Sequence, residues 1–260
     1  MDKSLTTLPP RDHGAASVFE PANLLREARR QKGLPDVSVP AVCALDPDGD
    51  LVRAIEASGE ARRHSGWACY HTAMTLLRAG GTEIGIVPCA VGAPFAVLVA
   101  EQLFASGCQL LISVTSAGQV LPVGSPPYFV VIEHALRDEG TSGHYLPAAA
   151  VVEADPALTT AALEALATAG ITAHAGLAWT TDAPFRETAA AIAAARDAGA
   201  LAVEMEAAGL YAFARARGRR VICLAHVTNT MAQDAGDFEK GEAMGAVATR
   251  RVIAALAKLL

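Results

Sequence analysis

The sequence lacks the features that mark nucleic-acid-binding and membrane proteins. Acidic residues outnumber basic ones by 27 to 21, the net charge is −6, and Lys and Arg form no long basic run. Because a basic patch is what binds the phosphate backbone, nucleic acid is not an expected partner. No apolar block approaches the roughly 18 residues that a membrane helix needs. Even the uncharged stretch 102–132 is interrupted by Gln, Ser, Thr, Gly and Pro, so no membrane partner is expected either.

The sequence also lacks cysteine pairs and histidine groups with the spacing of a metal or redox site. We therefore expect neither a metal nor an organic cofactor. The cysteines are predicted to be buried, reduced thiols of a cytoplasmic protein. An apolar signal-peptide core is missing from residues 1–20, which favours the same compartment. The five cysteines are Cys43, Cys69, Cys89, Cys108 and Cys223.

What the sequence does contain is a repeated alternation of helical and strand-like stretches. The 260 residues are 52% hydrophobic, enough for one or at most two domains with a sizeable core. Four Ala-rich stretches end in Gly, which caps helices in the left-handed conformation, and an apolar run follows each. This alternation predicts an α/β fold with a largely parallel or mixed sheet. The predicted helices are 94–106, 156–169, 187–198 and 206–217, and the strands after them are 109–114, 171–179, 200–203 and 221–227.

The remaining elements show no change of composition that would divide the chain further. Residues 1–35 are predicted to be an N-terminal extension with a helix of its own at 21–32, and residues 36–260 a single domain. A polar loop at 140–147 is long enough to cover a site. The other predicted elements are strands at 37–45, 82–87 and 129–133 and helices at 50–58 and 239–260.

Ligands of α/β sheets bind at the carboxyl ends of strands, so the residues after each strand are the candidates for a site. The turn 46–53 places Gly49, which lets the backbone approach a ligand, just before a helix, with Arg53 one turn inside it. That combination suits an oxyanion. The same residues also make an ordinary tight turn with an acidic N-cap.

Three further strand ends carry polar groups. Residues 115–118 offer two hydroxyls and a flexible backbone, which suit a phosphate group or a water molecule. The segment 180–186 contains hydroxyls, a carboxylate, an aromatic ring and a guanidinium, which suit a heterocycle, although an N-cap followed by a proline turn explains it equally well. Asn229, at the end of the strand 221–227, can face a base edge or cap the next turn.

The least ordinary feature is an acid pair inside an apolar run, Glu204-Met205-Glu206. Burying an unpartnered carboxylate costs several kcal/mol or shifts its pKa. If the backbone is extended here, Glu204 and Glu206 share a face and Met205 points the other way. A buried carboxylate accepts hydrogen bonds from both hydroxyls of a vicinal diol, so ribose is a natural ligand. Alternatively, the acids only favour the positive end of the helix that follows.

Taken together and in order, these motifs resemble the purine nucleoside/uridine phosphorylase family, which also includes nucleosidases that cleave methylthioadenosine. The resemblance covers about residues 37–260 and is closest to the uridine phosphorylase branch over 113–185. It implies a three-layer α/β/α sandwich with a central mixed sheet and a homo-oligomer with sites near subunit interfaces. The motifs are Val203–Tyr211, Asp48–Arg53, Gly92–Pro94, Thr115–Gly118, Thr181-Asp182 and Val227–Asn229.

The resemblance also implies a role for each candidate residue. Phosphate would be bound by Gly49, Arg53, Ser116 and Thr115. Ribose would be held by Met205, Glu206 and Glu204. The base would lie along Thr181, Asp182, Phe185, Arg186 and Asn229, and Glu206, Asn229 and Arg53 would carry the catalysis. An Asn at 229, where adenosine-accepting members have an acidic Asp, resembles the members that take 6-oxopurines or uracil.

The implied function is the cleavage of a 6-oxopurine or uracil nucleoside by phosphate to a free base and a sugar 1-phosphate. Two alternatives stand beside it: a nucleosidase that uses water, and a catalytically weak nucleoside-binding protein on the same scaffold. The departures from the family pattern bear on this choice. Ser113 stands where the phosphorylases have an Arg, and the Gln–Arg pair that reads uracil is not clearly present. A further phosphate-binding Arg usually comes from a neighbouring subunit, for which Arg62, Arg63 or the region of His71 are the candidates.

Overall fold

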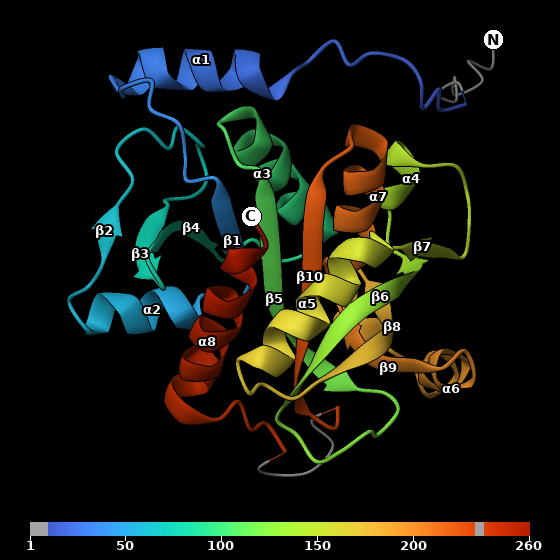
Figure 1. Ribbon diagram of the computed structural model, residues 1–260. Helices are drawn as coiled ribbons and strands as arrows, with labels where there is room; N and C mark the ends of the chain where they lie inside the picture. Colours follow the sequence, from blue (N-terminus) through green and yellow to red (C-terminus); the bar gives the residue numbers. More distant parts are fainter. Residues whose placement is uncertain (1–9, 232–236) are drawn as a thin grey trace, which may run out of the picture.

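One mixed sheet runs through the protein, whose computed structural model describes residues 10–231 and 237–260 (Figure 1). Within those residues the sheet has ten strands in the order β10-β6-β8-β9-β5-β1-β4-β3-β2, with β7 paired to β6. The strands are β1 Val42–Asp46, β2 Arg62–Arg63, β3 Thr75–Ala79, β4 Thr82–Pro88, β5 Leu110–Gln119, β6 Tyr128–Asp138, β7 Val151–Glu153, β8 Ala173–Thr181, β9 Ala200–Glu204 and β10 Arg220–Asn229.

Part of this sheet closes on itself. Strand β5 is parallel to both β1 and β10, and β10 is antiparallel to β6. Strands β6, β8 and β9 continue in parallel, and β9 returns to the end of β5 as an antiparallel pair at Gly118 and Gln119. The ring β5-β10-β6-β8-β9 therefore brings the ends of β5, β9 and β10 close together.

Helices cover both faces of the sheet. The core on one face is built on α3 and α7, and the core on the other on α2, α5 and α8 (Figure 1). This arrangement confirms the predicted three-layer α/β/α sandwich with a mixed sheet. The α-helices are α1 Pro21–Lys32, α2 Asp50–Ala57, α3 Ala93–Ala105, α4 Ser142–Tyr145, α5 Pro156–Thr168, α6 Ala189–Asp197, α7 Ala207–Arg217 and α8 Ala246–Leu256, with 3-10 turns at Pro184–Arg186, Glu242–Gly245 and Ala257–Leu259.

Several predicted boundaries are wrong. The strand predicted at 109–114 continues to Gln119, so Thr115 and Ser116 lie within β5 and not in a turn after it. The final helix starts at Ala246 and not at residue 239, because Gly241 and Gly245 adopt φ of 84° and 81°, which an α-helix excludes. Pairing with β10 and β9 explains the extra length of β5, since a neighbouring strand supplies hydrogen bonds that local sequence does not reveal.

Other elements differ more modestly. The strand predicted at 37–45 begins only at Val42, after a proline that cannot donate to a sheet. The strand predicted at 129–133 runs on to Asp138, β3 was not predicted, and the loop 140–147 contains the short helix α4. Cys89 is exposed, contrary to the expectation of five buried thiols, because it lies in the connection after β4.

The N-terminal region packs onto the body of the protein. Leu25 and Ala28 of α1 are buried against Ala68, and Lys32 Nζ donates to the carbonyl oxygens of Ala68 at 3.3 Å and Cys69 at 2.8 Å. Further upstream, Arg11 lies 3.1 Å from the His144 ring. The division at residue 35 stays a prediction.

The close approach of α3 and α7 gives a test of the packing. A Cβ at Gly209 of α7 would lie 2.7 Å from the Cβ of Ala93 of α3, so Gly209→Ala forces two rigid backbones apart. We expect this overpacking to outweigh the roughly 1 kcal/mol gain in helix propensity and to lower the free energy of unfolding by at least about 1 kcal/mol in urea. Gly124→Ala is the control, since that position has no atom within 4 Å. Equal stability of the two variants would show that the approach is not tight.

Candidate active site

The polar residues that the sequence singles out lie where the strands end, and hydrogen bonds join the segments that carry them. Glu206, after β9, accepts a hydrogen bond from the Gly92 N–H before α3, with N and Oε1 2.7 Å apart. Ser116 of β5 bonds to Asp48 in the turn after β1. Asn229, at the end of β10, contacts the carbonyl of Ala117. These hydrogen bonds bring several of the candidate residues to the carboxyl ends of β1, β5, β9 and β10.

Glu204 organises the start of α7. Its buried carboxylate accepts hydrogen bonds from the Thr180 hydroxyl and from the N–H groups of Glu206 and Ala207, both at 2.7 Å. The Thr180 hydroxyl in turn accepts from the Ala208 N–H at 3.0 Å. Glu204 is therefore a helix-capping acid, as the alternative interpretation of the sequence proposed.

Glu206 is held differently. Strand β9 ends at Glu204, and Glu206 has φ −127° and ψ −37°, so the extended backbone that would place both acids on one face is not present. The side chain is 1% exposed, and its Oε2 oxygen has no hydrogen-bond partner among the residues that the structure describes. Burial, and next the charge on Glu204, raise the pKa of Glu206 to about 8, against the opposing Gly92 N–H and Thr115 hydroxyl. A buried polar oxygen without a partner needs an explanation, and a bound ligand would supply one. Met205 beside it is half-buried.

The turn after β1 is shaped by Gly49. Its φ is +73°, and a Cβ there would lie 2.9 Å from both Arg53 Nη1 and Cys89 Sγ. The Gly49 N–H donates to the Asp46 carbonyl at 2.9 Å, so it closes the turn and does not point at a ligand. Asp46 caps α2 through the Val52 N–H, and burial raises the pKa of Asp46 to about 6, with smaller effects from neighbouring charges.

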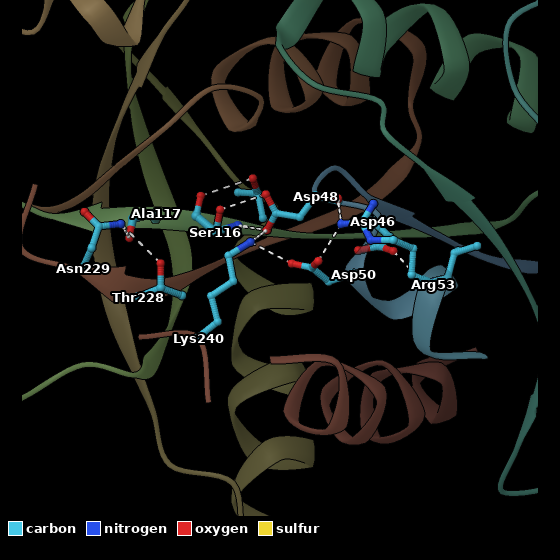
Figure 2. Close-up of polar contacts among 11 residues, drawn as sticks. Asp46, Asp48, Asp50, Arg53, Ser116, Ala117, Thr228, Asn229 and Lys240 are labelled. Carbon is cyan, nitrogen blue, oxygen red and sulfur yellow. Dashed lines mark hydrogen bonds and ion pairs between the residues drawn. The ribbon is translucent and has the colours of Figure 1, made fainter. Parts of the chain in front are cut away.

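A carboxylate occupies the donors that the resemblance assigns to phosphate (Figure 2). Asp48 Oδ1 accepts from the Ser116 hydroxyl at 2.9 Å, and Asp48 Oδ2 accepts from the Ser116 N–H at 3.1 Å. The Lys240 ammonium lies 3.5 Å from the same Oδ2 and 2.7 Å from Asp50 Oδ2. Arg53, on the other side of Asp50, donates to it at 2.5 Å and to the Asp48 carbonyl at 2.7 Å. The Ser116 donors are therefore occupied by a carboxylate of the protein itself.

The other candidates for the phosphate site differ in how close they lie to Ser116. Thr115 is buried, its hydroxyl acts on the Glu206 carboxyl, and it lies 3.4 Å from the Ser116 carbonyl. Ser113 is 1% exposed and brings no charge. Arg62 and Arg63 are exposed on β2, where they pair with Glu83 at 3.2 Å and Glu56 at 3.6 Å. Any part that they play in the phosphate site stays a prediction.

Asn229 closes the other end of the site. It is 7% exposed, and its Oδ1 accepts from the Met231 N–H at 2.9 Å. Its Nδ2 makes two long contacts, at 3.4 Å to the Ala117 carbonyl and 3.3 Å to the Thr228 hydroxyl. Contacts of this length are weak, so the amide is able to exchange them for a base carbonyl.

The candidate residues at and after the end of β8 differ in exposure, because Thr181 is buried and the others are exposed. Thr181 is buried and accepts from the Ala183 N–H, and Asp182 accepts from the Gly140 N–H at 2.9 Å, which ties this segment to the loop before α4. Phe185 is 99% exposed, and Arg186 is exposed beside it. The roles of Asp182, Phe185 and Arg186 toward a base stay predictions.

Two residues of the site were missed in the sequence. Lys240 gives no local signal, because it reaches Asp50 across 190 positions. His226 pairs in register with Ser116, and its ring stacks on Phe129 with centroids 4.4 Å apart. Burial lowers the pKa of His226 to about 4, Asp48 opposes this shift and Lys240 adds to it, so the ring is neutral at pH 7. An alternating strand pattern could have placed His226 on the same face as Ser116.

Metal sites and membrane spans have no candidates within the described part of the chain. No cluster of three or more His, Cys, Asp or Glu side chains there could hold a metal ion. Among the described helices, none is long and apolar enough to span a membrane.

Comparison with known proteins places these observations in a family. Residues 42–260 match the family model of the phosphorylase superfamily. A uridine phosphorylase of Thermococcus kodakarensis is 27% identical over 219 residues, which cover 79% of this chain and 74% of that protein. The fold is similar to the crystal structure of a Vibrio fischeri uridine phosphorylase complexed with 6-hydroxy-1-naphthoic acid, with a TM-score of 0.71, 23% identity and coverage of 85% of this chain and 91% of that one.

The raised pKa of Glu206 predicts how stability depends on pH. Between the ordinary value of 4.5 and about 8, the folded chain keeps a proton that the unfolded chain has lost. The free energy of unfolding should therefore fall as pH rises, by as much as about 1.4 kcal/mol per pH unit. Glu206→Gln removes this loss, so its stability relative to wild type should increase from about pH 5 to about pH 8 in urea titrations. Parallel curves would contradict the shift, and Glu164→Gln, at an exposed helical position, is the control.

Proposed function

The chain belongs to the phosphorylase superfamily, and from that premise we propose that it cleaves the N-glycosidic bond of a nucleoside with phosphate, as a pentosyltransferase. The products are a free base and a sugar 1-phosphate. The observation that carries the proposal is the buried Glu206 carboxyl, whose Oε2 oxygen has no partner in the described chain while Oε1 is fixed by Gly92. The names of the relatives, both uridine phosphorylases, support the same reaction.

The residues divide the work between the two ends of the breaking bond. The electron pair of the bond between C1′ and the base nitrogen leaves with the base, and a phosphate oxygen forms the new bond to C1′. The sugar becomes positively charged in the transition state, and the carboxylate form of Glu206, which has already lost its proton to solvent, stabilises that charge. Glu206 accepts hydrogen bonds from the ribose hydroxyls, Met205 packs on the sugar, and Glu204 keeps Glu206 in position by capping α7.

The base end is assigned to Asn229 with Thr181 and the exposed segment 182–186. An amide donates to a carbonyl oxygen but cannot protonate a ring nitrogen as an acid could. The proposed substrates are therefore 6-oxopurine or uracil nucleosides. Phe185 and Arg186 would have to fold over the base from their exposed positions.

The proposal also covers the cofactor requirement, the cellular compartment and the oligomeric state of the enzyme. Phosphate is a co-substrate, and no cofactor is needed because the chemistry requires only charge stabilisation at both ends of the bond. The five cysteines are free thiols, four of them buried, which suits a reducing, cytoplasmic compartment. A homo-oligomer would bring further residues to the site.

A second candidate is hydrolysis, favoured by one specific observation. The Asp48 carboxylate already occupies the Ser116 donors, and Ser113 supplies no positive charge to displace it. A carboxylate held in this way is placed to take a proton from a water molecule that attacks C1′. The reaction would then give free sugar and need no phosphate.

The identity of the sugar product decides between these candidates. Losing one bidentate Arg contact typically costs about 1.5–3 kcal/mol, or roughly 10- to 150-fold in affinity, so we expect phosphorolysis with a weak phosphate KM, in the millimolar range or above. Uridine and inosine are incubated with and without phosphate, and the sugar is identified. Sugar 1-phosphate that disappears in Arg53→Ala supports phosphorolysis. Free sugar formed at an unchanged rate without phosphate would refute it in favour of hydrolysis.

Glu206 itself is tested by kinetics. Glu206→Gln keeps the shape but cannot form the carboxylate that stabilises the positive sugar. We expect kcat/KM for a ribonucleoside to fall by at least about 10²-fold, or roughly 2.7 kcal/mol, with folding nearly intact. Glu164→Gln, far from the site in sequence and exposed, should retain wild-type kinetics. Normal activity of Glu206→Gln would show that this residue is only a helix-terminus acid.

A further inference from the structure

The anion position beside Ser116 has a cation that the family resemblance does not account for. Lys240 comes from the segment before α8, and its side chain is only 12% exposed. Its ammonium bridges Asp48, in the turn after β1, and Asp50, at the start of α2 (Figure 2). We propose that Lys240 is a phosphate-binding residue of this chain, in place of the arginine missing at Ser113, and that the Asp48 carboxylate keeps the phosphate position filled until phosphate displaces it. This inference rests on the proposed phosphorolysis.

The geometry defines one anion position with three donors. Asp48 Oδ2 accepts the Ser116 N–H at 3.1 Å and lies 3.5 Å from Lys240 Nζ, while Asp48 Oδ1 accepts the Ser116 hydroxyl at 2.9 Å. A carboxylate oxygen and a phosphate oxygen accept the same donors. The Asp48 carboxylate therefore shows where a phosphate group would be bound by Ser116 and Lys240.

The backbone holds Lys240 at this place. The Glu239 N–H donates to the Thr228 carbonyl at 2.8 Å, which fastens the segment to the end of β10. The Gly241 N–H donates to Glu239 Oε1 at 2.7 Å, so the residues on both sides of Lys240 are tied. Because β10 pairs with β5, this attachment delivers the ammonium to Ser116.

Charge explains why phosphate needs Lys240. Arg53 is the other cation at the turn, and its side chain is 61% exposed and bound to Asp50. At position 113, where the family resemblance predicts a second arginine, this chain has a small, buried serine. Lys240 is thus the low-exposure cation that faces the Ser116 donors. An ammonium acts as a point charge and does not need the two-pronged geometry of an arginine.

The Asp48 carboxylate makes phosphate binding competitive. Phosphate must take the Ser116 donors and the Lys240 charge from it. The apparent affinity therefore equals the intrinsic affinity multiplied by the fraction of molecules in which Asp48 has moved away. Removing the charge of Asp48 should therefore strengthen phosphate binding, whereas removing the charge of Lys240 should weaken it.

The test is a calorimetric titration with inorganic phosphate and no nucleoside. We expect Lys240→Met to weaken phosphate binding by at least about tenfold and Lys240→Arg to keep most of it. Asp48→Asn should bind phosphate at least about fivefold more tightly, and the double variant should lose that gain. Lys258→Met removes the same charge from an exposed position near the C-terminus and should bind like wild type. The KM for nucleoside should change little in Lys240→Met while the KM for phosphate rises.

Each outcome of this titration decides the proposal. Equal phosphate affinity of wild type and Lys240→Met would overturn the role of Lys240, and unchanged affinity of Asp48→Asn would overturn the competition. If the wild type releases free sugar without phosphate, the proposed phosphorolysis fails. The titration then still decides the inference, since phosphate binding to Asp48→Asn that requires Lys240 supports it and phosphate binding to none of the variants overturns it.

Discussion

The burial of the Glu206 carboxyl next to a second buried acid is the constraint on which the site depends. Glu204 is tolerated because the Thr180 hydroxyl and two N–H groups at the start of α7 satisfy it. The Gly92 N–H at the start of α3 holds one oxygen of Glu206, and the other oxygen has no hydrogen-bond partner in the described chain. The two helices must therefore begin side by side, and the absence of a side chain at Gly209 is what lets them approach.

The polar groups beside Ser116 differ from Glu206 in having their hydrogen-bond partners within the protein. One oxygen of Glu206 has no partner in the described chain, whereas the Ser116 donors are satisfied by the Asp48 carboxylate of the protein itself. Asp48, Asp50 and Lys240 form a network that is complete without phosphate. A completed network lowers the affinity for an incoming anion. The absence of an arginine at position 113 lowers it further, and a low phosphate affinity favours water as the nucleophile in the proposed reaction.

The sequence was sufficient for the helix–strand alternation, the mixed sheet and the acid pair, because periodicity, glycine caps and a charged residue in an apolar run are local signals. It was not sufficient for the length of β5 or for Lys240, since ring closure and a contact across 190 positions depend on the tertiary fold. The proposed base segment shows the same limit, because the sequence shows that Phe185 is an aromatic residue after β8 but not that its side chain is 99% exposed.

The central claim is that Glu206 binds the ribose hydroxyls, and a double-mutant cycle on binding tests it most directly. Affinities of uridine and 2′,3′-dideoxyuridine, or of the inosine pair, are measured by calorimetry without phosphate for wild type and Glu206→Gln. The account predicts that losing the hydroxyls weakens binding to wild type by at least about tenfold and has little further effect in Glu206→Gln. Equal discrimination by both proteins would contradict it.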